Sequence, residues 1–209
     1  MSAINVDPKV YELLEVVHET VDPLGVEYAI GGALAMAAAG YARHTKDVDL
    51  FVVEKDRFKV LRALRRAGLD VISVFEPHHY AAYLPGHHDD LEVRIDVMEP
   101  ADEPDLSAIE YPERKALTKG GHEFNVVIPD LLAVMKYHSD REKDEDDFRA
   151  MYRHATFDPE QVRAIVVYLA GEEDADEAGR EWDKLIASFQ RRKMTSRPKA
   201  KRKYTPPGR

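Results

Sequence analysis

The sequence predicts an α+β protein in which a mixed β-sheet with flanking helices is followed by a helical part and a basic end. Up to residue 128, short apolar runs with strand-like alternation come between helical segments. From residue 129 onward the apolar residues keep to helical spacing. Residues 191–209 contain nine Lys or Arg, three prolines and no acid, which is typical of a disordered tail. We therefore expect domains over 1–128 and 129–190 and a disordered basic tail over 191–209.

The first part of the chain is expected to form a helix, a strand and a second helix. Asp7 is a good cap and Pro8 suits a first helical turn, and the apolar spacing that begins at Val10 continues the helix. A short strand over 26–30 runs into a glycine pair, and an alanine-rich helix follows over 33–39. Because alanine side chains are small, this helix can pack closely on a sheet.

Further strands and helices follow in order. Residues 47–53, with the sequence DVDLFVV, predict a largely buried strand. The next helix has Phe58, Leu61 and Leu64 on an apolar face and cations on a solvated one. Strands are expected over 71–75, 80–84 and 91–98, the last two joined by the hairpin loop PGHHDD, and as a short pair between 109 and 128. Later helical faces lie at 131–135, 148–152, 162–169 and 182–189.

Composition excludes several classes of site. The 209 residues include no cysteine, which excludes disulfide scaffolds, thiolate zinc or iron–sulfur sites and thiol nucleophiles, and fits a reducing cytoplasm. No apolar run approaches the roughly 20 residues of a membrane helix, and the opening MSAINVDPKV lacks the features of a signal peptide. We expect a soluble cytoplasmic protein with no membrane partner.

The charge is unevenly distributed along the chain. The formal net charge is −9, but without residues 191–209 the remaining 21 basic and 39 acidic residues give −18. A run of cations is commonly a solvated tail, and clustered cations also bind the phosphate backbone of nucleic acids without sequence specificity. Both roles stay open for this tail.

Two acids on the strand over 47–53 carry the strongest chemical signal. Asp47 and Asp49 lie two residues apart, so both carboxylates project from one face of the strand, while Val48 and Leu50 project from the other. Neighbouring carboxylates repel one another and are costly to desolvate, so a cation is expected beside them. Mg²⁺ suits this role because it prefers oxygen ligands and substrate phosphates. A solvated edge strand is the alternative.

A third acid is available on the strand over 91–98. Apolar residues alternate along this strand, and Arg94 and Asp96 share its other face. If the two strands are neighbours, Asp96 joins Asp47 and Asp49. Three carboxylates facing one cavity meet the requirement of two-metal phosphoryl chemistry, in which one ion activates an attacking hydroxyl and both hold the phosphate being displaced. A salt bridge between Asp96 and Arg94 is the alternative.

A glycine pair, Gly31-Gly32, comes at the expected turn from strand to helix. Glycine permits close backbone approach at such a turn, and the unpaired N–H groups at a helix N-terminus bind phosphate. On its own a glycine pair is a weak signal. Its position fifteen residues before the Asp-x-Asp strand, counted from Gly32 to Asp47, makes the combination more specific.

Two blocks of residues resemble motifs of the DNA polymerase β-like nucleotidyltransferase superfamily. The first block is Gly31-Gly32, then Arg43-x-Thr45-x-Asp47-x-Asp49, and later Asp96. The second is Leu131-Leu132-Ala133-x-x-Lys136, then Arg141-x-Lys143-Asp144-x-x-Asp147-Phe148. The sequence is most similar to the small bacterial branch that includes abortive-infection toxins of toxin–antitoxin pairs. The resemblance spans roughly residues 26–153 and leaves out the acidic helix 172–190 and the tail.

The resemblance implies transfer of a nucleoside monophosphate from an NTP to a hydroxyl acceptor, with release of pyrophosphate. The implied fold is a nucleotidyltransferase-like mixed sheet with a small helical domain after it. NTP, with ATP as one candidate, would be the substrate. The acceptor stays open between transfer RNA, a protein hydroxyl, an aminoglycoside-like small molecule and an NTP. An antitoxin protein is a further partner that the resemblance suggests, and RNA contact is one that the charge of the basic tail suggests.

The resemblance also implies roles for the first-block residues. Asp47, Asp49 and Asp96 would hold two Mg²⁺ ions, with Mn²⁺ as a substitute, and Asp96 would help to deprotonate the acceptor. Gly31 and Gly32 would lie against the triphosphate.

Three other residues would contact phosphate. Thr45 would donate a hydrogen bond to a phosphate oxygen, and Lys136 would neutralise charge on the β- or γ-phosphate. Arg43 is a weaker candidate for the same task. A lysine that only extends its amine to solvent is the alternative for Lys136.

For the second block, which consists of Arg141, Lys143, Asp144 and Asp147, a functional role and a helix with local ion pairs are both open.

Two departures from the family pattern leave a second class of function open. Many members have Ser at the second glycine or just before the acidic strand, where this chain has Gly32 and Lys46. Lys46 beside Asp47, or a tight pair between Arg94 and Asp96, would give a catalytically silent NTP-binding or protein-interaction module. A nucleic-acid-binding protein that works through its tail is the third hypothesis.

Histidines offer a rival metal site. His78-His79 and His87-His88-Asp89-Asp90 supply nitrogen and oxygen ligands that suit a transition metal. They lack a fixed helical spacing, so we interpret them as surface histidines.

Overall fold

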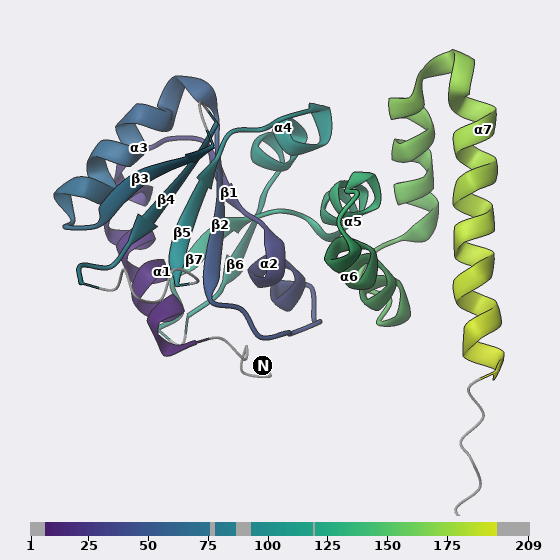
Figure 1. Ribbon diagram of the computed structural model, residues 1–209, viewed down its shortest axis with the longest axis horizontal. Helices are drawn as coiled ribbons and strands as arrows, with labels where there is room; N and C mark the ends of the chain where they lie inside the picture. The colour runs from purple at the N-terminus through teal and green to yellow at the C-terminus, as the bar shows by residue number, and fades with distance from the viewer. Residues whose placement is uncertain (1–6, 76–77, 87–92, 119, 196–209) are drawn as a thin grey trace, which may run out of the picture. The chain divides into compact units, whose positions relative to one another are not determined.

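The computed structural model describes residues 7–75, 78–86, 93–118 and 120–195 (Figure 1). The chain divides into two compact units, Met1–Val162 and Arg163–Arg209. The helices that follow residue 128 up to Val162 therefore group with the sheet. The expected domain boundary between residues 128 and 129 stays a prediction.

A mixed β-sheet forms the centre of the first unit, as the sequence predicts. Its described strands are β1 (Tyr28–Ile30), β2 (Asp47–Val52), β3 (Asp70–Phe75), β4 (His79–Tyr83), β5 (Arg94–Met98), β6 (Glu113–Ala116) and β7 (Glu123–Val126). They lie in the order β3-β4-β5-β2-β1-β7-β6. The pairs β2–β5 and β1–β7 are parallel and the other pairs are antiparallel. The strand that carries the third acid, β5, therefore lies directly beside β2, which carries the first two.

Helices cover both faces of this sheet (Figure 1). The helices of the first unit are α1 (Pro8–Thr20), α2 (Gly32–Ala38), α3 (Glu54–Arg66), α4 (Glu103–Glu110), α5 (Pro129–His138) and α6 (Glu142–Arg153), with a 3₁₀ turn over Asp22–Leu24. α1 packs against α3 and the strands β2 and β5, whereas α2 and α4 pack against α5 and against β2 from the other side. The acidic face of β2 therefore looks toward α2 and α5.

Local sequence signals explain how the core forms. Asp7 caps α1, because its carboxylate accepts a hydrogen bond from the backbone N–H of Lys9 at 3.0 Å. The predicted apolar face of α1 is fully buried, and so are Val48 and Leu50 on the inner face of β2. The alternation along β2 thus assigns one face to the core and the other to the carboxylates.

Two details of the predicted elements are wrong. Phe58 was expected to be buried but is 57% exposed. The apolar residues on the buried face of α3 are Val60, Leu61 and Leu64, and Phe58 lies outside this face. Arg57, expected on the solvated face, is buried and forms an ion pair with Glu99. A buried charge needs such a partner.

Helix α4 lies where no helix was expected. Its start was readable in the sequence, since Asp102 caps the helix by accepting the N–H of Asp105 at 3.1 Å and Pro104 lies in the first turn. These signals were overlooked because the surrounding segment is rich in Pro and acidic residues.

The second unit consists of helical segments. α7 (Pro159–Thr195) is interrupted at Gly171, which has φ 77° and ψ 169°. After this break the chain runs back along itself, so that Arg163 forms an ion pair with Asp183 at 3.0 Å.

Three aromatic residues of these helices, Trp182, Phe189 and Tyr168, are expected from the sequence to be core positions. Trp182 and Phe189 are buried, as expected, but the prediction for Tyr168 is wrong, because its side chain is 73% exposed.

The basic tail begins later than the sequence suggests. The prediction of disorder over 191–195 is wrong, because α7 continues to Thr195. Arg and Lys are good helix formers and are favoured in the last turns of a helix, so a basic run can extend one. The rest of the predicted tail, 196–209, lies outside the described residues, as do the histidines and acids over 87–90.

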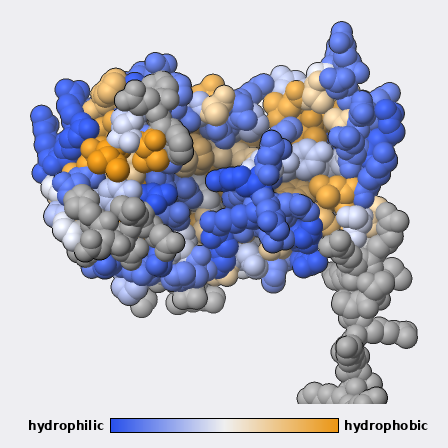
Figure 2. All heavy atoms as spheres, viewed as in Figure 1, coloured by the Kyte–Doolittle hydropathy of each residue, from blue (hydrophilic) through white to orange (hydrophobic). Residues whose placement is uncertain are grey.

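The face of the molecule drawn in Figure 2 is mainly hydrophilic. Figure 2 shows hydrophilic side chains over most of the visible face, with small hydrophobic patches between them. Among the helices that the structure describes, none is long and apolar enough to cross a membrane.

Candidate functional site

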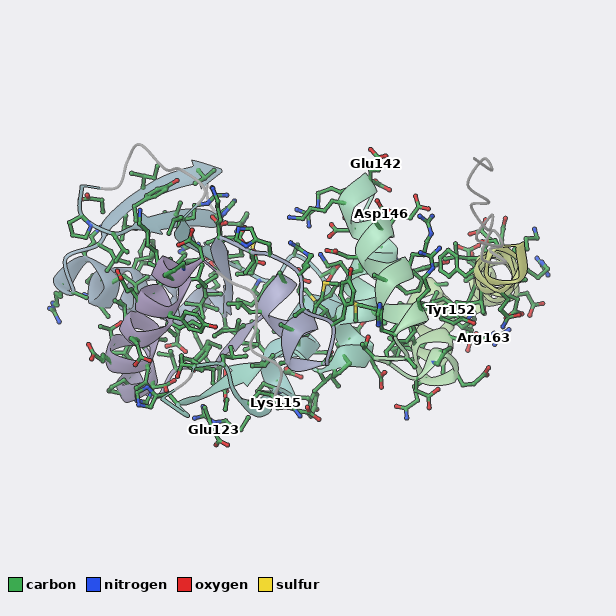
Figure 3. All side chains as sticks on the ribbon, turned by 90° about the horizontal axis from the view of Figure 1, so that it is seen from below. Lys115, Glu123, Glu142, Asp146, Tyr152 and Arg163 are labelled. Atoms are coloured by element: carbon green, nitrogen blue, oxygen red, sulfur yellow. The ribbon has the colours of Figure 1, made fainter. Side chains whose placement is uncertain are left out.

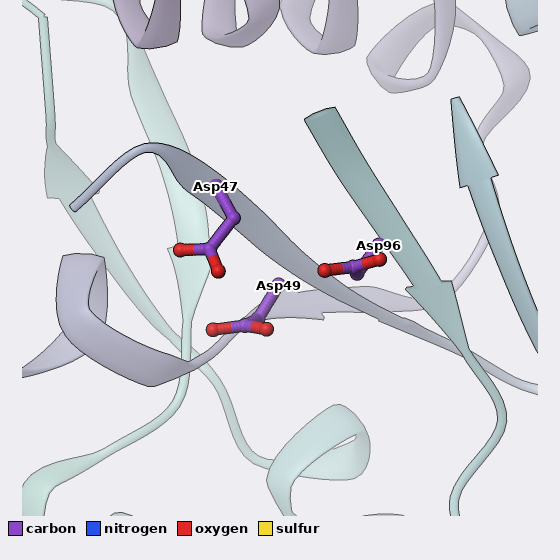
Figure 4. A group of neighbouring side chains, drawn as sticks. All are labelled: Asp47, Asp49 and Asp96. Carbon is purple, nitrogen blue, oxygen red and sulfur yellow. The ribbon is translucent and has the colours of Figure 1, made fainter. Parts of the chain in front are cut away.

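Three carboxylates meet at the ends of β2 and β5 (Figure 4). The parallel register places Asp49 opposite Asp96, and the two-residue period of β2 brings Asp47 to the same face. One ligand atom from each of the three residues lies within 4.8 Å of the others. The structure thus brings together all three predicted acids, which come from two strands far apart in sequence.

Repulsion within this cluster changes the chemistry of Asp49. Burial, followed by the charges of Asp47 and Asp96, raises the pKa of Asp49 from 3.8 to about 6, although Lys136 and Lys143 oppose the shift. A cluster that resists its own ionisation is stabilised by a cation among its oxygens. This electrostatic imbalance, together with an all-carboxylate donor set, fits a hard divalent cation such as Mg²⁺.

The flanking acids are oriented by neighbouring side chains. Thr45 is buried and donates its hydroxyl to Oδ1 of Asp47 at 2.5 Å. Arg94 Nε and His79 Nε2 both contact Oδ1 of Asp96, at 2.7 and 2.9 Å. Neither contact uses Oδ2 of Asp96. The pair with Arg94 therefore exists, and it uses the same carboxylate oxygen of Asp96 as the contact with His79.

His79 is a site residue that sequence reasoning missed. The interpretation of His78-His79 as surface histidines is wrong for His79, which is half-buried and contacts Asp96. β4 pairs with β5 in a register that places Ala81 opposite Asp96, which brings the start of β4 to the site. The only signal in the sequence was the predicted hairpin between these strands.

Gly32 makes room for Asp49. A Cβ atom on Gly32 would lie 1.6 Å from Oδ2 of Asp49, and the φ of Gly32 is +54°. Gly31 has a different neighbour, since a Cβ there would lie 2.5 Å from Cε2 of Phe51. Its N–H donates to the backbone oxygen of Asp49 at 2.9 Å. The glycine pair is thus required to place α2 directly against the acidic strand.

Lys136 is the centre of a buried ionic network. It is only 8% exposed, it forms an ion pair with Asp144, and its Nζ lies 3.2 Å from Oδ2 of Asp147. Arg43 contacts the same Asp147, with Nε 3.1 Å from Oδ1. The network joins α5, α6 and the segment before β2. The picture of Lys136 as a lysine extended to solvent is therefore wrong.

Helix α6 separates its acids by face. Asp144 and Asp147 are buried, whereas Glu142 and Asp146 are exposed and labelled in Figure 3. Burial opposes the ionisation of Asp144, but hydrogen bonds from Lys136 and Ser139 and nearby cationic charge outweigh it, so the pKa of Asp144 lies below its ordinary value. Asp144 is therefore held ionised beside the cations of the network.

The two remaining residues of the second block differ in their contacts. Arg141 forms an i,i+3 ion pair with Asp144 and has a side chain that is 77% exposed. Lys143 is exposed and, within the described part of the chain, forms no hydrogen bond or ion pair. Local ion pairing thus accounts for part of the block, and contacts to other elements account for the rest.

Two cavities lie beside the acidic cluster, and among the residues that the structure describes they share no lining residue. The first, which we call the Asp49 pocket, has a volume of about 240 Å³. It is lined by Gly32, Asp49, Phe51, Met98, Asp105, Leu132, Met135, Lys136, Arg141 and Asp144. The second, the basic pocket, has a volume of about 400 Å³. It is lined by Arg43, His44, Thr45, Lys46, Asp47, Arg94 and Lys143.

Lys46 belongs to the basic pocket and not to the acidic cluster. Among the described residues, none of Asp47, Asp49 and Asp96 forms an ion pair with it. The departure from the family pattern at Lys46 therefore leaves the carboxylates in place.

Lys136 should be necessary for stability. We expect Lys136→Met to lower the free energy of unfolding by about 3–5 kcal/mol, because Asp144 and Asp147 would lose a buried cation. Lys115, which is paired with Glu113 and has a side chain that is 44% exposed, provides a control, and Lys115→Met should cost less than about 1 kcal/mol. Urea unfolding measures both variants. Equal values would contradict the assigned network.

Gly32→Ala should destabilise the protein more than an alanine at another glycine with positive φ. Gly25 is a matched control, because its φ is +62° and no atom lies within 4 Å of its added Cβ. Each substitution carries a backbone cost of about 1 kcal/mol, and only Gly32→Ala also displaces Asp49. In an Asp49→Ala background the excess should disappear, which a double-mutant cycle by urea unfolding tests. An unchanged excess would show that the clash lies elsewhere.

Asp49→Asn should stabilise the metal-free protein at pH 7. The folded-state pKa of about 6 exceeds the ordinary 3.8, so ionisation of Asp49 destabilises the fold progressively as the pH rises between those values. The advantage of the Asn variant should be near zero below pH 4 and reach a plateau, on the order of 3 kcal/mol, above pH 6. Thermal and urea unfolding in a chelator across this range provide the measurement. A variant less stable than wild type at pH 7 would refute the electrostatic account.

Comparison with known proteins identifies the family. The family model described as nucleotidyl transferase of unknown function, DUF2204, matches residues 10–173, which is more than half of the chain. A search of curated proteins finds no match.

Solved structures with a similar fold are nucleotidyltransferases or resemble them. The antibiotic-resistance factor ANT(2'')-Ia is 15% identical, with a TM-score of 0.52 over 88% of this chain and 96% of that chain. An antigenic nucleotidyltransferase-like protein from Paracoccidioides brasiliensis is 17% identical, with a TM-score of 0.53 over 89% of each chain. A putative nucleotidyltransferase from Thermotoga maritima is 11% identical, with a TM-score of 0.49 over 72% of this chain and 97% of that chain.

At these identities the structural likeness establishes the fold, and it is the mixed sheet expected from the sequence. The glycine turn, the three acids and the network on α5 and α6 all fall within residues 10–173. The chain therefore belongs to this nucleotidyl transferase family, within the nucleotidyltransferase superfamily.

Proposed function

We propose that the protein transfers a nucleoside monophosphate from an NTP to a hydroxyl group of an acceptor and releases pyrophosphate. The observation that carries this proposal is the cluster of three carboxylates on adjacent strands, beside a glycine turn that only glycine can form. Family membership makes nucleotidyl transfer the expected chemistry. ANT(2'')-Ia, which has this fold, is also described in complex with adenylyl-2''-tobramycin.

The Asp49 pocket is suited to the nucleotide. Phe51, Met98, Leu132 and Met135 give it an apolar wall against which a base can pack. The same pocket also has polar lining, in which Gly32 permits close approach and Arg141 supplies an exposed cation. This arrangement supports a base held by apolar contact and phosphates held near the acidic cluster.

Two cations, which differ in how far their side chains can move, would balance the charge on the phosphates. Arg141 is largely exposed, so its guanidinium can turn toward a phosphate oxygen. Lys136 is held by Asp144 and Asp147, so it acts through its field and not by moving. Arg43 and Thr45, which the resemblance assigns to phosphate, are already used by Asp147 and Asp47. We assign these two residues to orienting the acids.

Asp47, Asp49 and Asp96 would hold the divalent cations, with Mg²⁺ preferred and Mn²⁺ as a substitute. When bound, such ions supply Lewis-acid activation of the hydroxyl and of the phosphate. In the transfer, the acceptor oxygen forms a bond to the α-phosphorus, the bond to the bridging oxygen breaks, and pyrophosphate leaves. Asp96 takes up the hydroxyl proton, and His79 and Arg94 hold its carboxylate in position.

A catalytically silent NTP-binding module is the second candidate. The pair between Arg94 and Asp96 at 2.7 Å favours it, because an arginine can replace a metal ion beside a carboxylate. Binding of NTP that does not depend on Mg²⁺ would support this candidate. An antitoxin partner and RNA contact through the tail stay predictions.

Calorimetric titration of the four NTPs, with and without Mg²⁺, tests the proposal. We expect Mg²⁺-dependent binding by the wild type and by Asp174→Asn, an exposed control on α7, and a loss of at least about tenfold in Asp49→Asn. Asp49→Asn should also abolish transfer of α-labelled nucleotide while it remains folded. Transfer by Asp49→Asn at the wild-type rate would overturn the assignment.

A further inference from the structure

One acid that lines the Asp49 pocket, Asp105, belongs neither to the carboxylate cluster nor to the ionic network. The other two acids among the described lining residues do, since Asp49 is part of the cluster and Asp144 is bound by Lys136. Asp105 lies in the first turn of α4, a helix that contacts β2 and α5. The pocket therefore has a carboxylate that the chemistry proposed so far does not use.

The two central strands arrange the pocket along their length. Asp49 is paired with Asp96, and two residues further along the same strands Phe51 is paired with Met98. Because residues two apart share a face of a strand, the apolar pair lies on the face of the cluster, about 7 Å further along. A nucleotide with its phosphates at the cluster would therefore lay its base over Phe51 and Met98. Asp105 lines the same pocket.

The carboxylate of Asp105 has room for further hydrogen bonds. Its Oδ2 accepts the backbone N–H of Ala101 at 3.0 Å. A carboxylate has about four lone-pair sites on its two oxygens, so most of its capacity remains. In the part of the chain that the structure describes, no cation forms an ion pair with Asp105.

The surroundings of Asp105 favour a ligand that donates hydrogen bonds. Burial raises the pKa of Asp105, against the hydrogen bond from Ala101 and together with the charge of Asp102. A half-buried carboxylate that lacks a cation is costly to keep ionised, and donated hydrogen bonds offset this cost.

The four bases differ in what they offer to a carboxylate. The Watson–Crick edge of guanine has two adjacent donors, N1–H and N2–H₂, which match the two oxygens of a carboxylate. Adenine and cytosine have one donor beside a ring nitrogen that accepts, and uracil has one donor between two carbonyl oxygens. An acceptor placed against a carboxylate oxygen is repelled, so only guanine offers a fully matched edge.

We infer that Asp105 selects a guanine base, so that GTP is the preferred nucleotide of the Asp49 pocket. The base packs against the apolar wall, and its N1–H and N2–H₂ donate to the carboxylate of Asp105. The apolar wall can pack against any base, so discrimination comes from these donated hydrogen bonds. This inference rests on the proposed function, because it uses the place of the nucleotide given there.

Binding measurements on the full chain test the inference without relying on transfer. Calorimetry in the presence of Mg²⁺ compares GTP, ATP and inosine triphosphate, whose base is guanine without the N2 amino group. Asp105→Asn keeps the size of the side chain and an acceptor for Ala101, but it replaces the other oxygen with an N–H donor. Asp105→Ala is a second variant, which removes the acceptor without adding a donor.

Asp102→Asn is the matched control. Asp102 has the same charge, lies three residues away and is absent from the described lining of the pocket. It caps α4 by accepting the N–H of Asp105, and asparagine caps a helix equally well. This control therefore removes one negative charge near the pocket while the helix is kept.

We expect the wild type to bind GTP at least about tenfold more tightly than ATP and about fivefold more tightly than inosine triphosphate. In both Asp105 variants the preference for GTP over inosine triphosphate should disappear, whereas Asp102→Asn should keep the wild-type order. A wild type that binds ATP or inosine triphosphate as tightly as GTP overturns the inference. A GTP preference that survives in both Asp105 variants overturns it as well.

Asp49→Asn separates this inference from the proposed function. Mg²⁺-dependent transfer that is lost in Asp49→Asn but shows no preference for GTP would support the proposed function and refute the inference. A GTP preference that depends on Asp105, in a protein that transfers no nucleotide, would have the opposite meaning. A wild type that binds none of the three nucleotides would overturn both.

Discussion

The parallel pairing of β2 with β5 is the constraint on which the site depends. Each strand puts alternate residues into the core and into the site, so the register that packs Leu50 beside Val97 also sets Asp49 beside Asp96. A slip of one residue would send the carboxylates into the apolar core. The core therefore specifies the position of the acids, and the acids can repel one another without moving apart.

The repulsion between the three carboxylates is opposed by cations on other elements of the fold. Lys136 and Lys143 lower the pKa of Asp49 against the effect of its neighbours, and they come from α5 and α6. Asp144 and Asp147 hold Lys136 in place, and Asp147 also holds Arg43 beside the acidic strand. The main role of the second block is thus to position charged side chains. Its ion pairs hold cations close to the acidic cluster but away from the carboxylates of that cluster.

Several features of the site lower the stability of the fold. Three close carboxylates and a glycine with positive φ are unfavourable for folding, and a divalent cation with a triphosphate would relieve the first of these. The two pockets on either side differ in chemistry, one with an apolar wall and one lined by cations.

Strand alternation is a short-range property, and it was enough to place Asp47 and Asp49 on one face of a strand and Asp96 on one face of another. The family resemblance added the nucleotidyltransferase-like mixed sheet and the meeting of the three acids, which the pairing of β2 with β5 confirms. These sequence signals could not reveal that His79 contacts Asp96 or that Thr45 is used by Asp47, since both depend on how strands pair and turn. Nor could they give the partners of Lys136 and Arg43, which lie on other elements. Tertiary packing settles these contacts, because a buried charge takes whichever opposite charge the folded chain brings to it.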